Sequence, residues 1–70
     1  MVVNQIMWVQ VKSAPNLMMA EMWKEFFEGE GIPARLLEEP GGSGSKELSV
    51  YRVMVSEERV HIVREVLKKL

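Results

Sequence analysis

Few side chains in this 70-residue chain are of the types that perform chemistry, and their spacing matches no catalytic or metal-binding pattern. His61 is the single histidine, and the sequence contains neither cysteine nor aspartate. One imidazole without these partners cannot form a typical zinc site or a Ser-His-Asp triad. The sequence therefore predicts no catalytic residue, no metal and no cofactor, and a protein that is not an enzyme.

Two pairs of adjacent carboxylates, Glu38-Glu39 and Glu57-Glu58, are the next candidates for acid–base chemistry. Neighbouring residues in a strand point to opposite faces, so the first pair would not converge on one substrate. Glutamates in the first turn of a helix stabilise the helix dipole, which explains the second pair. We interpret both pairs as solvated surface charge.

A run of proline, glycine and serine over residues 40–45, followed by Lys46, superficially resembles a phosphate-binding loop. In such loops Ser or Thr follows the lysine, and the loop joins a strand to a helix. Here Glu47 follows, and the flanking residues predict a hairpin. We expect a flexible hairpin loop over residues 39–47. In an alternative function, sensing of a small molecule or nucleotide, this loop would contact the effector through Gly41, Gly42, Gly44 and Lys46.

Composition limits the class of protein. A chain of 70 residues allows one domain, which spans residues 1–70. The formal net charge of -1 argues against a general nucleic-acid binder, because such proteins carry a strong basic excess. The sequence shows no signal-peptide pattern and no apolar run of about 18 residues. We therefore expect a cytoplasmic protein that does not enter membranes.

Hydrophobic periodicity predicts a strand and then a helix in the first half of the chain. Apolar and polar residues alternate over 5–12, which is typical of a strand. Asn16 is a good helix N-cap, and helical spacing predicts a helix over 17–28 that ends at Gly29 and Gly31 in left-handed conformations. The predicted buried stripe of this helix is Met19, Met22, Trp23 and Phe26, flanked by Ala20 and Phe27.

Two strands and a second helix follow. Alternation predicts strands over 32–38 and 48–55, and Ser56 is a candidate cap for the last helix. The predicted buried stripe of that helix is Val60, Val63, Val66, Leu67 and Leu70. The order β-α-β-β-α predicts an α+β fold, a ferredoxin-like half or split βαβ. The third strand would lie between the first two in an antiparallel sheet, and both helices would cover one face.

Strand alternation also predicts which side chains the helices leave uncovered. Met7, Val9, Val11, Ile32, Ala34, Leu36, Tyr51, Val53 and Val55 would face the helices. Ile6, Trp8, Gln10, Arg35, Leu37, Val50, Arg52 and Met54 would lie on the opposite face, with Lys12 beyond them. A sheet face in water is normally polar, so this mixture of apolar residues and arginines indicates an interaction surface.

The uncovered face supports three interpretations. The first is self-association, as a homodimer, through this face or through the free edge of the first strand. Its candidate interface residues are Ile6, Trp8, Arg35, Leu37, Val50, Arg52 and Met54. The second is that Trp8 packs beneath the N-terminal residues of its own chain. The third, RNA stacking on Trp8 beside Arg35 and Arg52, is disfavoured by the single aromatic side chain. Another protein partner is also compatible with the surface.

Several motifs resemble those of a known bacterial family. They are Trp8-Val9-Gln10-Val11, Ala20-Glu21-Met22, Gly31-Ile32-Pro33-Ala34 and Val53-Met54-Val55-Ser56-Glu57-Glu58. In these segments the chain is similar to the prokaryotic signal-transducing protein family, short domains of unknown function with a PII-like, ferredoxin-like fold. That family usually has proline at the position of Ser56. The resemblance implies a signalling module without recognised catalytic residues, and its loop between strands two and three would be shorter than the regulatory loop of PII.

Overall fold

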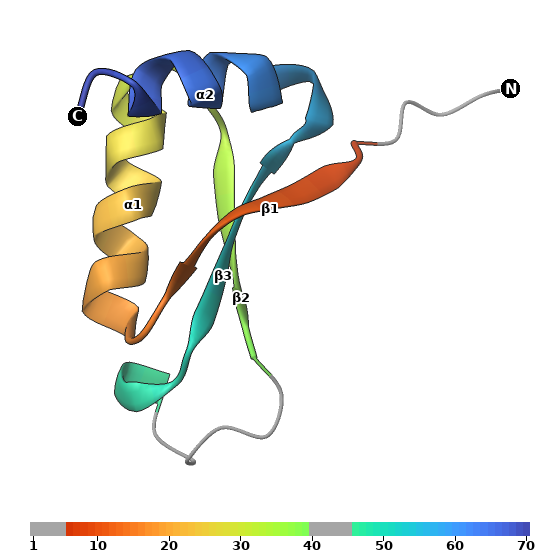
Figure 1. The fold of residues 1–70 in the computed structure, drawn as a ribbon. Coiled ribbons are helices and arrows are strands. Elements are labelled where there is room, and N and C mark those ends of the chain that lie inside the picture. Colours follow the sequence, from red (N-terminus) through yellow and green to blue (C-terminus); the bar gives the residue numbers. More distant parts are fainter. Residues whose placement is uncertain (1–5, 40–45) are drawn as a thin grey trace, which may run out of the picture.

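The computed structural model describes residues 6–39 and 46–70 and contains three strands, two α-helices and two short 3₁₀ turns (Figure 1). In chain order they are β1 (Trp8–Ala14), α1 (Leu17–Gly29), β2 (Ala34–Glu38), η1 (Lys46–Leu48), β3 (Tyr51–Ser56), η2 (Glu57–Arg59) and α2 (Val60–Leu67). No helix in the described part of the chain is long and apolar enough to cross a membrane.

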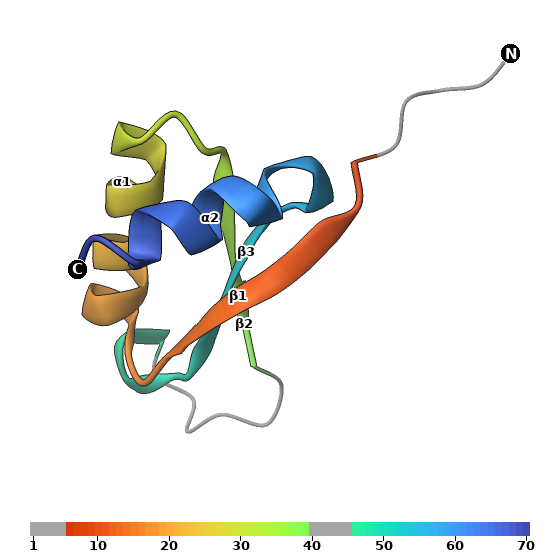
Figure 2. The ribbon, with the colours of Figure 1, turned by 45° about the horizontal axis from the view of Figure 1, so that its top comes forward.

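The sheet has the strand order β1-β3-β2, and both neighbouring pairs are antiparallel. The predicted fold is therefore confirmed: an α+β, ferredoxin-like half with the third strand in the centre. Figures 1 and 2 show α1 alongside the sheet and α2 running crosswise near the C-terminal end of α1. In a full ferredoxin-like fold another strand would pair with β1, so β1 forms an edge of the described sheet.

Helix α1 begins and ends as the sequence predicts, with one correction. The side-chain Oδ1 of Asn16 accepts a hydrogen bond from the backbone N–H of Met19 at 2.9 Å. Gly29 is still helical, and of these two glycines only Gly31 adopts a positive φ, of 81°. The prediction of a left-handed conformation at Gly29 was wrong, because the single glycine at 31 suffices to turn the chain toward β2.

A β-bulge in β1 changes which residues of this strand face the helices. Val9 lies opposite Val55, but Lys12 lies opposite Val53, so one extra residue is inserted between Gln10 and Lys12. The alternation therefore shifts by one after the bulge. Lys12 was predicted on the uncovered face; instead its Nζ lies 4.6 Å from the centre of the Trp23 ring on α1. Ala14 faces the helices and is fully buried.

The core lies between the sheet and the two helices. Its buried members are Ala14, Ala20, Phe27, Ile32, Tyr51, Val53, Val55, Val63 and Val66. The predicted core positions Met7, Met22 and Leu70 are exposed, so those predictions were wrong. Met7 precedes β1, and Leu70 follows the end of α2, so neither is held against the core.

The chain around β3 also differs from the prediction in two places. The strand begins at Tyr51 rather than Leu48, because residues 46–48 form η1. The hydroxyl of Tyr51 donates to the backbone carbonyl of Lys46 at 2.8 Å and closes this turn. Ser56 stands at the cap position before η2, but its side chain makes no capping hydrogen bond.

Candidate interaction surface

The strand register brings most of the predicted interface residues together on the face of the sheet that α1 and α2 do not cover. Across the three strands, Gln10, Met54 and Arg35 lie side by side in one row. Ser13, Arg52 and Leu37 form the next row, and Trp8 lies opposite Ser56 at the end. These residues define the helix-free face: Trp8, Gln10, Ser13, Arg35, Leu37, Arg52, Met54 and Ser56, with Glu39 and Val50 continuing the alternation of β2 and β3.

Ile6 and Val50 are the two candidates that lie outside the strands. Both are exposed. Val50 directly precedes β3, and its carbonyl accepts a hydrogen bond from the backbone N–H of Glu39 at 2.8 Å, which extends the pairing of β2 and β3. Ile6 precedes β1 and is not part of the ladder. The surface supported by the register therefore includes Val50 at one end, while Ile6 flanks it.

Trp8 is half-buried and lies on the helix-free face. Its ring is approached by the guanidinium of Arg35, whose Cζ lies 5.1 Å from the ring centre. Because Trp8 is on β1 and Arg35 on β2, this cation–π contact spans the central strand. Any contact between Trp8 and residues 1–5 lies outside the described residues, so the interpretation that the N-terminus covers this ring stays a prediction.

Arg52 and Glu39 form a two-bonded ion pair at the other end of this face. Arg52 Nε donates to Glu39 Oε1 at 2.6 Å, and a terminal guanidinium nitrogen donates to Oε2 at 3.0 Å. The hydrogen bond from Arg52 lowers the pKa of the Glu39 carboxyl below its usual value, and the same bond raises the pKa of Arg52. Arg52 is therefore paired with a carboxylate. Arg35, the other arginine of this face, forms no ion pair with a described residue.

A side-chain hydrogen bond joins the chain on the two sides of the 39–47 segment. Ser49 Oγ donates to Glu38 Oε2 at 2.6 Å, beside the hydrogen bond from Tyr51 to Lys46. Burial, followed by the nearby charges of Glu38 and Glu21, raises the pKa of Tyr51. Among the candidate effector contacts, Lys46 is exposed in η1, whereas Gly41, Gly42 and Gly44 lie outside the described residues. A sensor function for this loop stays a prediction.

No group of three potential metal ligands occurs within residues 6–39 and 46–70, and His61 is exposed on α2. The residues that sequence reasoning missed are Met18, Met22 and Leu48, which are exposed beside Glu21, Glu25 and Glu47. Helical spacing placed Met22 in the buried stripe. The available signal was the adjacent apolar pair Met18-Met19, whose side chains point about 100° apart around the helix. Met19 packs against the core, whereas Met18 is exposed.

Comparison of the chain with protein-family models, curated proteins and solved structures gives no match. The similarity to the prokaryotic signal-transducing protein family therefore stays an expectation that rests on the sequence motifs alone. The class that the fold defines is a small ferredoxin-like half domain.

Proposed function

We propose that this chain is a small, non-catalytic interaction module that self-associates as a homodimer through the helix-free face. The observation that carries the proposal is the position of Trp8, Met54 and Leu37 on the side of the sheet that neither α1 nor α2 covers. Leu37 is 42% exposed, and Trp8 and Met54 are half-buried. Tryptophan, methionine and arginine are enriched in protein interfaces, and this face contains all three.

The charges of the helix-free face complement themselves, which favours a second copy as the partner. Arg35 lies on β2 and Glu39 directly follows this strand, so each is two positions from Leu37, one on each side. A two-fold axis that passes through the contact at Leu37, in the plane of the contact and perpendicular to β2, would place Arg35 of each copy opposite Glu39 of the other copy. Such an isologous contact is the commonest interface of homodimers. It would give Arg35 a carboxylate partner and would add a second cation to the Arg52–Glu39 pair.

The size of the face predicts a weak dimer. Three strands spaced by about 4.8 Å, with about 3.3 Å per residue, give a footprint of about 250 Å² for five-residue strands. Stable interfaces bury about 800 Å² on each partner. Residues beyond the five-residue strands, such as Val50 at the end of the face and Ile6 beside it, must therefore contribute, and we expect dissociation in the micromolar range rather than an obligate dimer.

The edge of β1 is a weaker candidate for self-association than the face. A bulge interrupts its ladder between Gln10 and Lys12, and Pro15 follows the strand. Bulges, lysines and prolines are features that prevent edge strands from pairing with another chain. Only the first part of β1, before the bulge, offers a regular free edge.

Sedimentation equilibrium tests the proposal. We expect the mass of the wild-type chain to rise toward a dimer as its concentration increases to about 500 µM. Leu37→Glu should keep the chain monomeric, because it buries a charge at the centre of the contact. Met18→Glu, which introduces the same charge on the exposed side of α1, is the matched control and should dimerise normally. A wild-type chain that stays monomeric throughout, or equal effects of the two variants, would contradict the proposal.

A further inference from the structure

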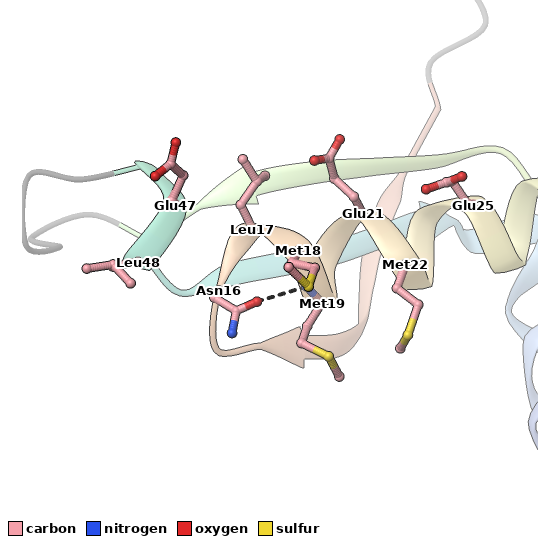
Figure 3. Close-up of a pocket in the computed structure, with 9 residues that line it drawn as sticks. All are labelled: Asn16, Leu17, Met18, Met19, Glu21, Met22, Glu25, Glu47 and Leu48. Carbon is pink, nitrogen blue, oxygen red and sulfur yellow. Dashed lines mark hydrogen bonds between the residues drawn. The ribbon is translucent and has the colours of Figure 1, made fainter.

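A second surface lies along α1 and η1 and shares no residue with the helix-free face. The first turns of α1 and the short turn η1 line a solvent-open groove of about 950 Å³ (Figure 3). It is lined by Asn16, Leu17, Met18, Met19, Glu21, Met22, Glu25, Glu47 and Leu48. We call this surface the α1 groove.

The floor of the α1 groove is apolar and exposed. Met18 is 80% exposed, Met22 47% and Leu48 70%. Met18 and Met22 are four residues apart, so they lie one turn apart along the same side of the helix. Methionine side chains are flexible and polarisable, and they adapt to apolar partners of different shapes. Because its floor is so exposed, the groove suits a segment of chain laid along it better than an enclosed small molecule.

The rim of the α1 groove is acidic. Glu21 and Glu25 lie one turn apart beside the methionines, and Glu47 lies on η1 (Figure 3). None of the three carboxylates forms an ion pair with a described residue, and no lysine, arginine or histidine lines the groove. The cation next along the helix, Lys24, is paired with Glu28 at 3.2 Å. Residues 1–5 and 40–45 contain no cationic side chain that would neutralise the rim.

We infer that the α1 groove binds a cationic amphipathic helix of a partner protein. The apolar side of that helix would contact Met18, Met22 and Leu48, and its lysines or arginines would pair with the carboxylates of the rim. A helix laid in an apolar groove is a common mode of peptide recognition, and complementary charge sets its orientation. The same carboxylates repel phosphates, which argues against nucleic acid or an anionic membrane at this site.

Fluorescence anisotropy with a designed probe tests this inference on the full chain. The probe is a labelled peptide of about 14 residues, built of leucine and lysine with the leucines at helical spacing. We expect saturable binding to the wild-type chain and binding about tenfold weaker for the double variant Glu21→Gln/Glu25→Gln. The substituted side chains are exposed and helix-compatible, so the variant should keep the far-ultraviolet circular dichroism of the wild type.

A charge-matched variant separates groove binding from general attraction. Glu30→Gln/Glu58→Gln changes the net charge by the same amount at exposed carboxylates outside the α1 groove, and it should bind like the wild type. Equal weakening in both double variants would overturn the inference, and so would equal binding of a peptide with the same composition in scrambled order. Loss of wild-type self-association in Glu21→Gln/Glu25→Gln would overturn it too, since the occupant would then be a second copy of this chain.

Discussion

At the scale of single residues, the Arg52–Glu39 pair shapes the electrostatics of the helix-free face. Two hydrogen bonds, at 2.6 and 3.0 Å, fix the guanidinium against the carboxylate. Paired donors and acceptors of this kind constrain both side chains more than a single contact does. The pair therefore holds Glu39 in a defined position, where it is available to an arginine of a second copy.

The pair predicts a pH-dependent contribution to stability. The folded-state pKa of Glu39 is lowered by the hydrogen bond from Arg52, so the stabilisation is complete above the usual carboxyl pKa of 4.5 and is lost as the pH falls through the folded-state value. Thermal melting of the wild type and Glu39→Gln should differ at pH 7 and converge in acid. Because the pair is solvent-exposed, we expect a small difference.

A matched variant removes the same pair from its other side. Arg52→Gln should give the same convergence with falling pH, because both variants lack the contact at every pH. Melting temperatures that differ from the wild type by a constant amount from pH 7 down to acid would contradict this account of the pair.

Single-residue contacts differ in how far the sequence predicts them. The Asn16 cap was predictable, because it depends on residues three positions apart in the chain. The contact between Arg35 and Trp8 was not, because it joins two strands across a third and depends on side-chain conformations. The alternation of residues along the strands predicted that both side chains would lie on one face of the sheet, but it did not predict that they would be in contact.

At the scale of elements, β1 shows where alternation fails as a guide. The sequence alternates regularly up to Val11, and nothing in the residue types marks an inserted residue before Lys12. A bulge arises from the fit of two strands to each other and to the helices, so one strand alone does not encode it. Its consequence is large: Ala14, rather than Ser13, faces the core.

Two substitutions with the same new side chain test the bulge. Ala14→Leu should destabilise the chain by about 1–3 kcal/mol, because the site is fully buried and has no room for a larger side chain. Ser13→Leu, on the exposed side, should change stability by less than about 0.5 kcal/mol. Urea unfolding measures both. The reverse order of effects would indicate a strand without the bulge.

Helix α1 shows a second limit of periodicity. Its sequence is apolar over more than half of its circumference, so the pattern predicts an amphipathic helix but not the centre of its buried stripe. The structure centres that stripe on Ala20, Trp23 and Phe27, which form or contact the core. The predicted centre included Met22, and the shift leaves the α1 groove open to solvent.

At the scale of the whole molecule, topology was the most predictable feature. The order of elements and the preference for right-handed crossovers restrict the arrangement to few alternatives, and the strand order β1-β3-β2 confirms the expected one. The functional surfaces were less predictable. They depend on which side chains the packed helices leave uncovered, and that follows only from the final register.

Helix α1 packs against the face of the sheet opposite the helix-free face (Figure 1), so the α1 groove, which is lined by residues of α1 and η1, lies outside the helix-free face. A dimer formed through the helix-free face would therefore present two α1 grooves. Such a dimer would bind a partner with two cationic helices more tightly than a single chain would, through the effective concentration of the second site.

The central claim, a two-fold contact through the helix-free face, is tested most directly by mixing two charge variants. In a dimer of Arg35→Glu alone, the new carboxylate would lie opposite Glu39 of the other copy. In a dimer of Glu39→Arg alone, the new guanidinium would lie opposite Arg35 of the other copy. Each variant alone would therefore bring like charges together. Sedimentation velocity should show monomers for each variant and dimers for their equimolar mixture, in which both contacts are again between opposite charges. Variants that dimerise like the wild type on their own, or a mixture that stays monomeric at concentrations where the wild type is dimeric, would contradict the claim.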